Sequence, residues 1–361
     1  MKVFYSLFFV NMLVQVVVFV PTMLINERFE GSVMAIFAGV LVGTVLLVLF
    51  VRSIGAFPGQ TLPDILAATS RWFHLPFLAL LCVTWFSAGL ISLLSINNMA
   101  IRFINVSFQG PAMILVFSIF ILWIMLFLGT PQILALVSVV LILNLPLIGI
   151  IFYQATRNEY IMWSSVLEVG TYWAILPSYK AITASSFMFT GYTNLVVFNK
   201  LIHKPVALGK LWIVPIIALL NLLTSVAVPI GLHGADGVND YMFPWVVTAD
   251  SLQIQYGPIE RLISVFLLLY VSISTISILI HWHVCHQLFL SMFKPNPRKP
   301  RKQTYLTYGL LLSFLVTTYL VEKNTREYEI FRFAEHWMML RLPAEILLVM
   351  TLVFMARRRK A

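Results

Sequence analysis

The residues best suited to chemistry form a polar cluster inside a long apolar segment, 187-FMFTGYTNLVVFN-199. Its centre, 190-TGYTN-194, falls where a membrane-spanning helix would lie deepest in the bilayer. Glycine permits non-helical backbone, and threonine and asparagine side chains hydrogen-bond the backbone groups that a broken helix leaves free. The cluster therefore predicts a discontinuous helix, the device with which transporters present helix ends to a substrate. A continuous helix with one polar face is the alternative.

Other apolar segments also carry polar side chains, which are costly in lipid and usually face a cavity or another helix. Asn11 and Gln15 lie four residues apart and so share one helix face. Ser92 lies in a later segment, and Ser272 and Thr275 lie in another. Each of these side chains either lines a site or hydrogen-bonds a neighbouring helix, and small hydroxyl residues most often serve close helix packing.

Two further groups have spacings that invite a chemical interpretation. Arg341 and Glu345 are four residues apart in the last apolar segment, and a structural ion pair near the outer mouth of that helix is favoured over a proton relay. The run 281-HWHVCH-286 places its histidines on different helix faces, so a metal would need ligands from another helix. We expect interfacial histidines and no metal site.

Motifs of known enzymes are absent from the sequence, which contains no HExxH, no GxSxG and no Walker loop with its lysine. An intramembrane hydrolase would need several titratable groups deep in one pocket, and Glu345 is the one clearly intramembrane acid. We therefore expect a protein that is not an enzyme and that needs no cofactor.

The composition indicates which elements must position these residues. The chain of 361 residues is 60% hydrophobic and 11% charged, with a mean hydropathy of +0.92. A soluble protein of this length cannot bury so much apolar surface, and the apolar runs are too continuous for a β-barrel. We expect an all-α integral membrane protein with about ten transmembrane helices. The candidate spans are 4–25, 32–53, 75–101, 111–129, 132–153, 178–200, 211–232, 258–288, 304–321 and 335–356.

The charged residues predict how the chain lies in the membrane. Lys and Arg concentrate at 200–210, 294–302 and 357–360, so we expect both termini on the cytoplasmic side. The net charge of +10 largely reflects this cytoplasmic collar, and no nucleic-acid partner is needed to explain it. The segment 57–73 is too polar to span but has apolar residues at helical spacing, which predicts an amphipathic helix on the membrane surface.

Three stretches of the chain resemble one known family. The segments 57-FPGQTLPDIL-66, 189-FTGYTNLVVFN-199 and 243-FPWVVTADSLQIQYGPIERLISVFLLLYVS-272 are similar to those of GerAB-type spore germination proteins, which belong to the amino acid–polyamine–organocation transporter superfamily. The resemblance covers the whole chain in length and helix number. Its most specific part runs into 257-GPIERL-262.

This resemblance implies a LeuT-like core of two inverted five-helix repeats, about 1–153 and about 178–356, within a single transmembrane domain of residues 1–361. Helices one and six would be discontinuous, and the ligand would lie among helices one, three, six and eight, with Tyr192 as a lid or selectivity wall. The ligand-binding candidates that follow are Asn11, Gln15, Ser92, Thr190, Gly191, Tyr192, Thr193, Asn194, Ser272 and Thr275.

The resemblance also implies a function, that of the B subunit of a germinant receptor in the inner membrane of the spore. Such a subunit senses a small-molecule germinant, often an amino acid, together with an A subunit and a C-subunit lipoprotein. Two rivals stay open, namely a secondary active transporter of amino acids or cations and an assembly subunit without a ligand. The second is favoured by 14-VQVVVFVPTML-24, which has no glycine at the expected break and leaves Pro21 to supply a kink.

Overall fold

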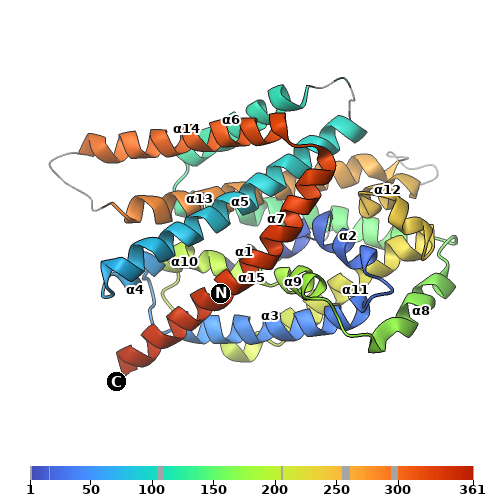
Figure 1. Ribbon diagram of the computed structural model, residues 1–361, viewed down its shortest axis with the longest axis horizontal. Coiled ribbons are helices and arrows are strands. Elements are labelled where there is room, and N and C mark those ends of the chain that lie inside the picture. The colour runs from blue at the N-terminus through green and yellow to red at the C-terminus, as the bar shows by residue number, and fades with distance from the viewer. Residues whose placement is uncertain are drawn as a thin grey trace.

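The protein is an all-α membrane protein whose long helices lie alongside one another in a bundle (Figure 1). The computed structural model describes residues 2–15, 17–104, 107, 109–204, 206–253, 261–293 and 300–360. It is 84% helical, and the described residues form no strand. Eight helices of the described part are long and apolar enough to cross a membrane, or up to ten spans if each of two bent helix pairs is one. The expected fold class is confirmed.

The long helices differ in how much of their surface is left for lipid. α5 (Arg71–Phe103) and α13 (Leu262–Ser291) pack along each other, and 67% of the apolar window of each is buried within the protein. In α7 (Thr130–Thr156) and α14 (Pro300–Asn324) the buried share is 17%, so most of their apolar surface faces outward. The other long helices are α3 (Ser32–Ile54), α6 (Gly110–Phe127), α11 (Ile213–His233) and α15 (Glu327–Lys360).

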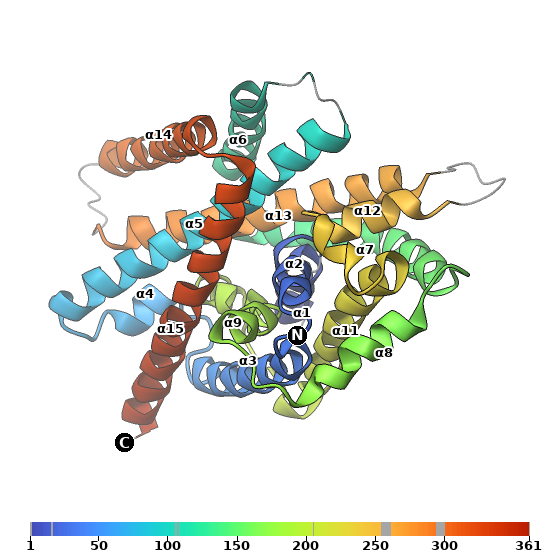
Figure 2. The ribbon, with the colours of Figure 1, turned by 45° about the vertical axis from the view of Figure 1, so that its right-hand side comes forward.

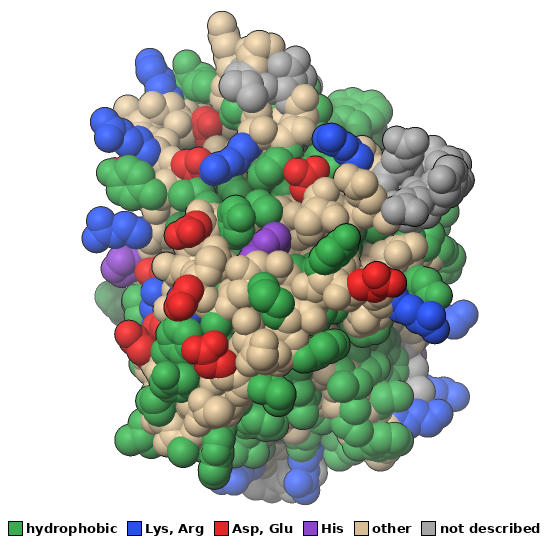
Figure 3. Space-filling model, turned by 90° about the vertical axis from the view of Figure 1, so that its right-hand side faces the viewer, with side chains coloured by type: hydrophobic (Ala, Val, Ile, Leu, Met, Phe, Trp, Pro, Cys, Tyr) green, Lys and Arg blue, Asp and Glu red, His purple; other side chains and the backbone are tan. Residues whose placement is uncertain are grey.

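The two ends of the bundle carry different features. Figure 2 shows α6 and α14 side by side at one edge, from which α15 continues past α5, α9 and α3. Many Asp and Glu side chains gather at the end of the bundle that carries α8 (Trp163–Thr171) and α12 (Pro244–Ser251) (Figure 3), whereas the C-terminus lies at the other end (Figure 1). Short 3-10 turns complete the connections: η1 (Tyr172–Ala174), η3 (Asn199–Leu201), η4 (Leu208–Lys210) and η5 (Gly237–Asp240).

The first span is broken between α1 (Lys2–Gln15) and α2 (Phe19–Asn26), whose axes differ by 50°. Pro21 explains the position of the break, because a continuous helix would need its missing N–H to bond the carbonyl of Val17 and would push its ring into that carbonyl. The Val18 carbonyl, next to the break, accepts from both the backbone N–H and the hydroxyl of Thr22, at 3.3 and 2.6 Å. The span therefore breaks without a glycine.

The sixth span is broken between α9 (Tyr179–Phe187) and a 3-10 turn, η2 (Thr190–Asn194), which continues into α10 (Leu195–Phe198); the bend is 61°. The polar side chains of the turn satisfy its own backbone: the hydroxyls of Thr190 and Thr193 donate to the carbonyls of Phe187 and Thr190 at 2.8 and 2.7 Å. Discontinuous helices one and six are thus confirmed, but the break in helix six is a tight turn rather than an extended unwound segment.

Gly191 is the residue that lets helix one reach the break in helix six. A Cβ atom at this position would lie 2.6 Å from the Leu7 carbonyl oxygen and 2.7 Å from the Phe8 Cα, both of which are backbone atoms of α1. Real Cβ contacts are never this short, so the two segments pack closely only because residue 191 has no side chain.

The segment 57–73 differs from the single surface helix that its sequence predicts. It contains the five-residue helix α4 (Leu62–Leu66), which begins with a capping box of Thr61 and Asp64, and its last residues already belong to α5. Asn199, at the end of span six, fixes the first residues of this segment. Its side-chain amide donates to the carbonyls of Phe57 and Gln60 at 2.7 and 2.8 Å. The chain therefore turns into α5 earlier than apolar spacing alone suggests.

Replacing Gly191 by alanine will push α1 away from η2 and lower the free energy of unfolding by about 1–3 kcal/mol, as overpacking does elsewhere. Thermal unfolding of the purified chain in nanodiscs measures the loss. Gly149→Ala is the matched control, because a Cβ there meets no atom within 4 Å. Equal unfolding temperatures for the two variants would show that the close approach is unimportant.

Candidate functional site

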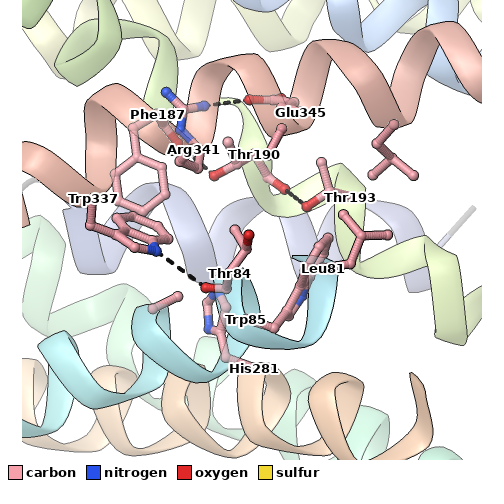
Figure 4. Close-up of a pocket in the computed structure, with 13 residues that line it drawn as sticks. Leu81, Thr84, Trp85, Phe187, Thr190, Thr193, His281, Trp337, Arg341 and Glu345 are labelled. Carbon is pink, nitrogen blue, oxygen red and sulfur yellow. Dashed lines mark hydrogen bonds and ion pairs between the residues drawn. The ribbon is translucent and has the colours of Figure 1, made fainter. Parts of the chain in front are cut away.

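A pocket lies beside the break in helix six, between α5, α9–η2 and α15 (Figure 4). About 410 Å³ of space that no atom fills lies between these helices, part of it open to the surroundings. Its walls are mainly apolar, with hydroxyl groups and one ion pair among them. The lining residues are Leu81, Thr84, Trp85, Ala88, Phe187, Thr190, Thr193, His281, Trp337, Arg341, Ala344, Glu345 and Leu348.

The ion pair on α15 connects this helix to the break in helix six. Glu345 accepts from the Arg341 guanidinium one turn earlier and from the Tyr192 hydroxyl of η2, the latter at 2.5 Å. Arg341 also donates to the Thr183 carbonyl and the Ser186 hydroxyl of α9, at 2.8 and 2.9 Å. Because both halves of helix six bond to the same pair, α15 fixes the angle between them.

Arg341 retains one donor that the protein does not use. Its Nε atom is buried and has no hydrogen-bond partner in the described part of the chain, while its terminal nitrogens bond Glu345 and α9. Arg341 lines the pocket, and only 4% of its surface is exposed. A buried donor without a partner is costly, so an acceptor atom of a ligand at this position would bind favourably.

Aromatic side chains of α5, α9 and α15 form much of the remaining wall, and their polar atoms bond within the protein. The indole N–H of Trp85 donates to Asn194 Oδ1 at 2.8 Å, and that of Trp337 donates to the Thr84 carbonyl at 3.3 Å. The ring of Phe187 stands edge-on to Trp337 at a centroid distance of 5.1 Å. With their polar atoms occupied, these rings present apolar surface to anything in the pocket.

Helix one supports the pocket from behind without lining it. Asn11 Nδ2 donates to the Phe187 carbonyl at 3.1 Å and to Thr190 Oγ1 at 3.0 Å, so α1 is bonded to the break itself. The site expected between helices one and six is therefore filled by direct contact, and the open space lies on the far side of helix six. Gln15 is buried near the end of α1 and does not line the pocket.

The predicted hydroxyl residues of helices three and eight satisfy their own helices. The hydroxyls of Ser92, Ser272 and Thr275 donate to carbonyls three or four residues earlier, at 3.0, 2.9 and 2.7 Å. Ser272 also donates to Asn144 of α7 at 3.1 Å. None of the three lines the pocket. Of the predicted set, Thr190 and Thr193 line it, while Asn11, Tyr192 and Asn194 hold its walls in place.

Several pocket residues were not among the sequence-based candidates. Arg341 and Glu345 were predicted to pair, as they do, but near a helix mouth rather than buried against helix six. Their spacing within an apolar helix was the signal for a buried functional pair. Trp85 and Trp337 carried no such signal, because a tryptophan in an apolar segment is ordinary core or interface material.

The histidines of 281–286 are spread over different partners within the bundle. His283 bonds Thr130 of α7 at 2.9 Å, and His286 bonds Thr307 of α14 at 3.2 Å. His281 bonds the Ser277 carbonyl at 2.7 Å and lines the pocket. His281 and His283 are buried rather than interfacial. Among the described residues no group of three His, Cys, Asp or Glu side chains is arranged to hold a metal ion.

Comparison with known proteins leaves the family open. No family model matches the chain, and no curated protein matches it. The most specific part of the resemblance, 257-GPIERL-262, falls largely outside the described residues, which resume at Arg261.

Replacing Glu345 by leucine will leave the Arg341 cation buried and alone, and removal of one partner of a buried pair typically lowers the free energy of unfolding by about 3–5 kcal/mol. The double variant Arg341→Leu/Glu345→Leu will be more stable than the single variant, since no lone charge remains. Thermal unfolding in nanodiscs measures both.

The control is Glu327→Leu, which breaks the exposed Arg102–Glu327 pair and will cost at most about 1 kcal/mol. If Glu345→Leu is as mild as this control, the pair does not fix helix six.

Proposed function

We propose that the protein is a ligand-sensing membrane subunit of a spore germinant receptor, whose ligand is a small molecule bound at the break in helix six. The observation that carries the sensing role is the pocket that opens beside Thr190 and Thr193, with an unused buried donor on Arg341. The germination role is supported by the resemblance of segments 57–66, 189–199 and 243–272 to GerAB-type proteins.

The charges of the pocket suit a small zwitterion or neutral molecule. Arg341 and Glu345 cancel each other, so a ligand with a net charge would meet no compensating charge. A carboxylate oxygen would accept from Arg341 Nε, an ammonium group would donate to the threonine hydroxyls, and a hydrophobic side chain would lie on the rings of Trp85 and Trp337. An amino acid has all three groups.

Ligand binding at this position can act on helix one through a single side chain. Thr190 lines the pocket, and its Oγ1 atom accepts from Asn11 of α1. A ligand that bonds Thr190 therefore competes with or strengthens the contact that holds α1 at the break, and it favours one arrangement of the two broken spans. The A subunit and the C-subunit lipoprotein would respond to that arrangement.

A secondary active transporter of amino acids or cations is the second candidate, favoured by the bends in both the first and the sixth span. Uptake of labelled amino acid into proteoliposomes that contain this chain alone separates the two functions. A receptor subunit will bind its ligand without gradient-driven accumulation, whereas a transporter will accumulate it.

Replacing Ala344 by leucine will fill the pocket without removing a polar group, and spores that carry it will need at least about tenfold more germinant for the same response, the effect of about 1.4 kcal/mol in binding. Germination is followed by the loss of optical density across a panel of amino acids, with protein levels measured by immunoblot.

Ala135→Leu is the matched control, because Ala135 is exposed on the lipid-facing helix α7. An unchanged germinant requirement in Ala344→Leu spores with normal protein levels would place the ligand elsewhere.

A further inference from the structure

A second polar pair, of one fully buried and one half-buried side chain, joins α5 to α14 and lies away from the pocket. Asn97 Nδ2 of α5 donates to Glu322 Oε1 of α14 at 2.6 Å, and Asn97 is fully buried. The first residue of α6, Gly110, packs against this pair. A Cβ atom added to Gly110 would lie 2.6 Å from Glu322 Oε1 and 3.5 Å from Asn97 Nδ2. Asn97 is nine residues beyond Ala88 of the pocket, roughly 13 Å along α5.

The remaining oxygen atoms of the two side chains are unpaired. Asn97 Oδ1 and Glu322 Oε2 are both buried, and neither has a hydrogen-bond partner in the part of the chain that the structure describes. If Glu322 were ionised, both atoms would be acceptors with no donor, an arrangement that buried groups avoid. A single proton on Oε2 satisfies both, since a carboxylic acid donates where the amide accepts and accepts where the amide donates.

Among the described residues, no cation forms an ion pair with the carboxyl group of Glu322. Arg102, five residues beyond Asn97 on α5, pairs instead with Glu327 of α15 at 3.4 Å. Lys323, the next residue of α14, is exposed to solvent.

The other helices that contact α14 offer no charge to this carboxyl group either. α6 has no titratable residue over 110–127. On α13, the Tyr270 hydroxyl donates to Ser95 at 2.9 Å, and His286 bonds Thr307 near the opposite end of α14. Arg326, beyond the end of α14, is exposed.

We propose that Glu322 and Asn97 form a proton-binding site, in which the protonated carboxyl group and the amide are joined by two hydrogen bonds. Loss of the proton would leave a charge and two unpaired acceptors between α5 and α14, so α14 and the adjoining start of α6 would loosen from α5. Since α5 also supplies Thr84 and Trp85 to the pocket, proton release and the shape of the pocket would be linked through one helix. This proposal does not depend on what the pocket binds.

The first test is infrared spectroscopy of the full chain in nanodiscs, with Glu322→Gln as the comparison. Glutamine can form both hydrogen bonds to Asn97 but carries no carboxyl group. The difference spectrum at neutral pH will contain the carbonyl stretch of a protonated carboxylic acid, present in the wild type and absent in the variant. A difference confined to carboxylate bands would overturn the proposal.

The second test follows thermal unfolding against pH in a sodium-free buffer. The folded wild type holds a proton that an unfolded glutamate releases above about pH 4.3, so its stability falls more steeply as pH rises than that of Glu322→Gln, which lacks this group. The difference between their unfolding temperatures will widen with pH, and Glu327→Gln will follow the wild type.

Two results would contradict a proton site. One is a difference in unfolding temperature between the wild type and Glu322→Gln that is independent of pH. The other is a wild-type chain that gains stability on addition of Na⁺ at constant pH while Glu322→Gln does not, which would assign the two oxygens to a cation.

Discussion

The structure depends on one constraint: the backbone freed where helix six breaks must find hydrogen-bond partners inside an apolar bundle. The turn meets part of this need itself, through the hydroxyls of Thr190 and Thr193. A neighbouring helix supplies another partner, because Asn11 of α1 donates to the Phe187 carbonyl at the end of α9. Arg341 of α15 holds α9 one turn earlier, at the carbonyl of Thr183. In lipid there is no water to replace these partners, so the bend in helix six requires α1 and α15 to lie where they do.

The same constraint leaves open space on only one face of the break in helix six. Helix one lies directly against η2, where Gly191 leaves room for its backbone, and so takes up the space that a ligand would need between the two broken spans. On the other face, the Arg341–Glu345 pair of α15 and the indole rings of Trp85 and Trp337 line the pocket that remains beside the turn. Thr190 belongs to both faces, since it lines the pocket and accepts from Asn11.

The sequence allowed the fold class and the break in helix six to be predicted, because each rests on a local property. The break in helix one was expected from the family resemblance, with Pro21 as the residue that could bend it. Continuous apolar runs make spans, Pro21 withholds an N–H, and 190–194 combines a residue without a side chain with residues that bond their own backbone. The position of the pocket could not be predicted in this way. Whether Ser92 or Ser272 faces a cavity depends on helix rotation, and in both cases the hydroxyl bonds its own helix. That α15 forms one wall of the pocket depends on contacts between residues 153 and 158 positions apart in the chain, Tyr192 with Glu345 and Thr183 with Arg341.

The most direct test of the pocket is protection of a cysteine placed in it. Cys82 and Cys285 are both buried and can be replaced by alanine to give a cysteine-free chain, into which Thr193→Cys is introduced. The account predicts that a small membrane-permeant thiol reagent labels this cysteine and that an amino acid germinant slows the labelling, whereas Thr156→Cys, exposed on α7, is labelled at the same rate with and without germinant. Labelling of Thr193→Cys that no effective germinant slows would contradict a ligand site at the break in helix six.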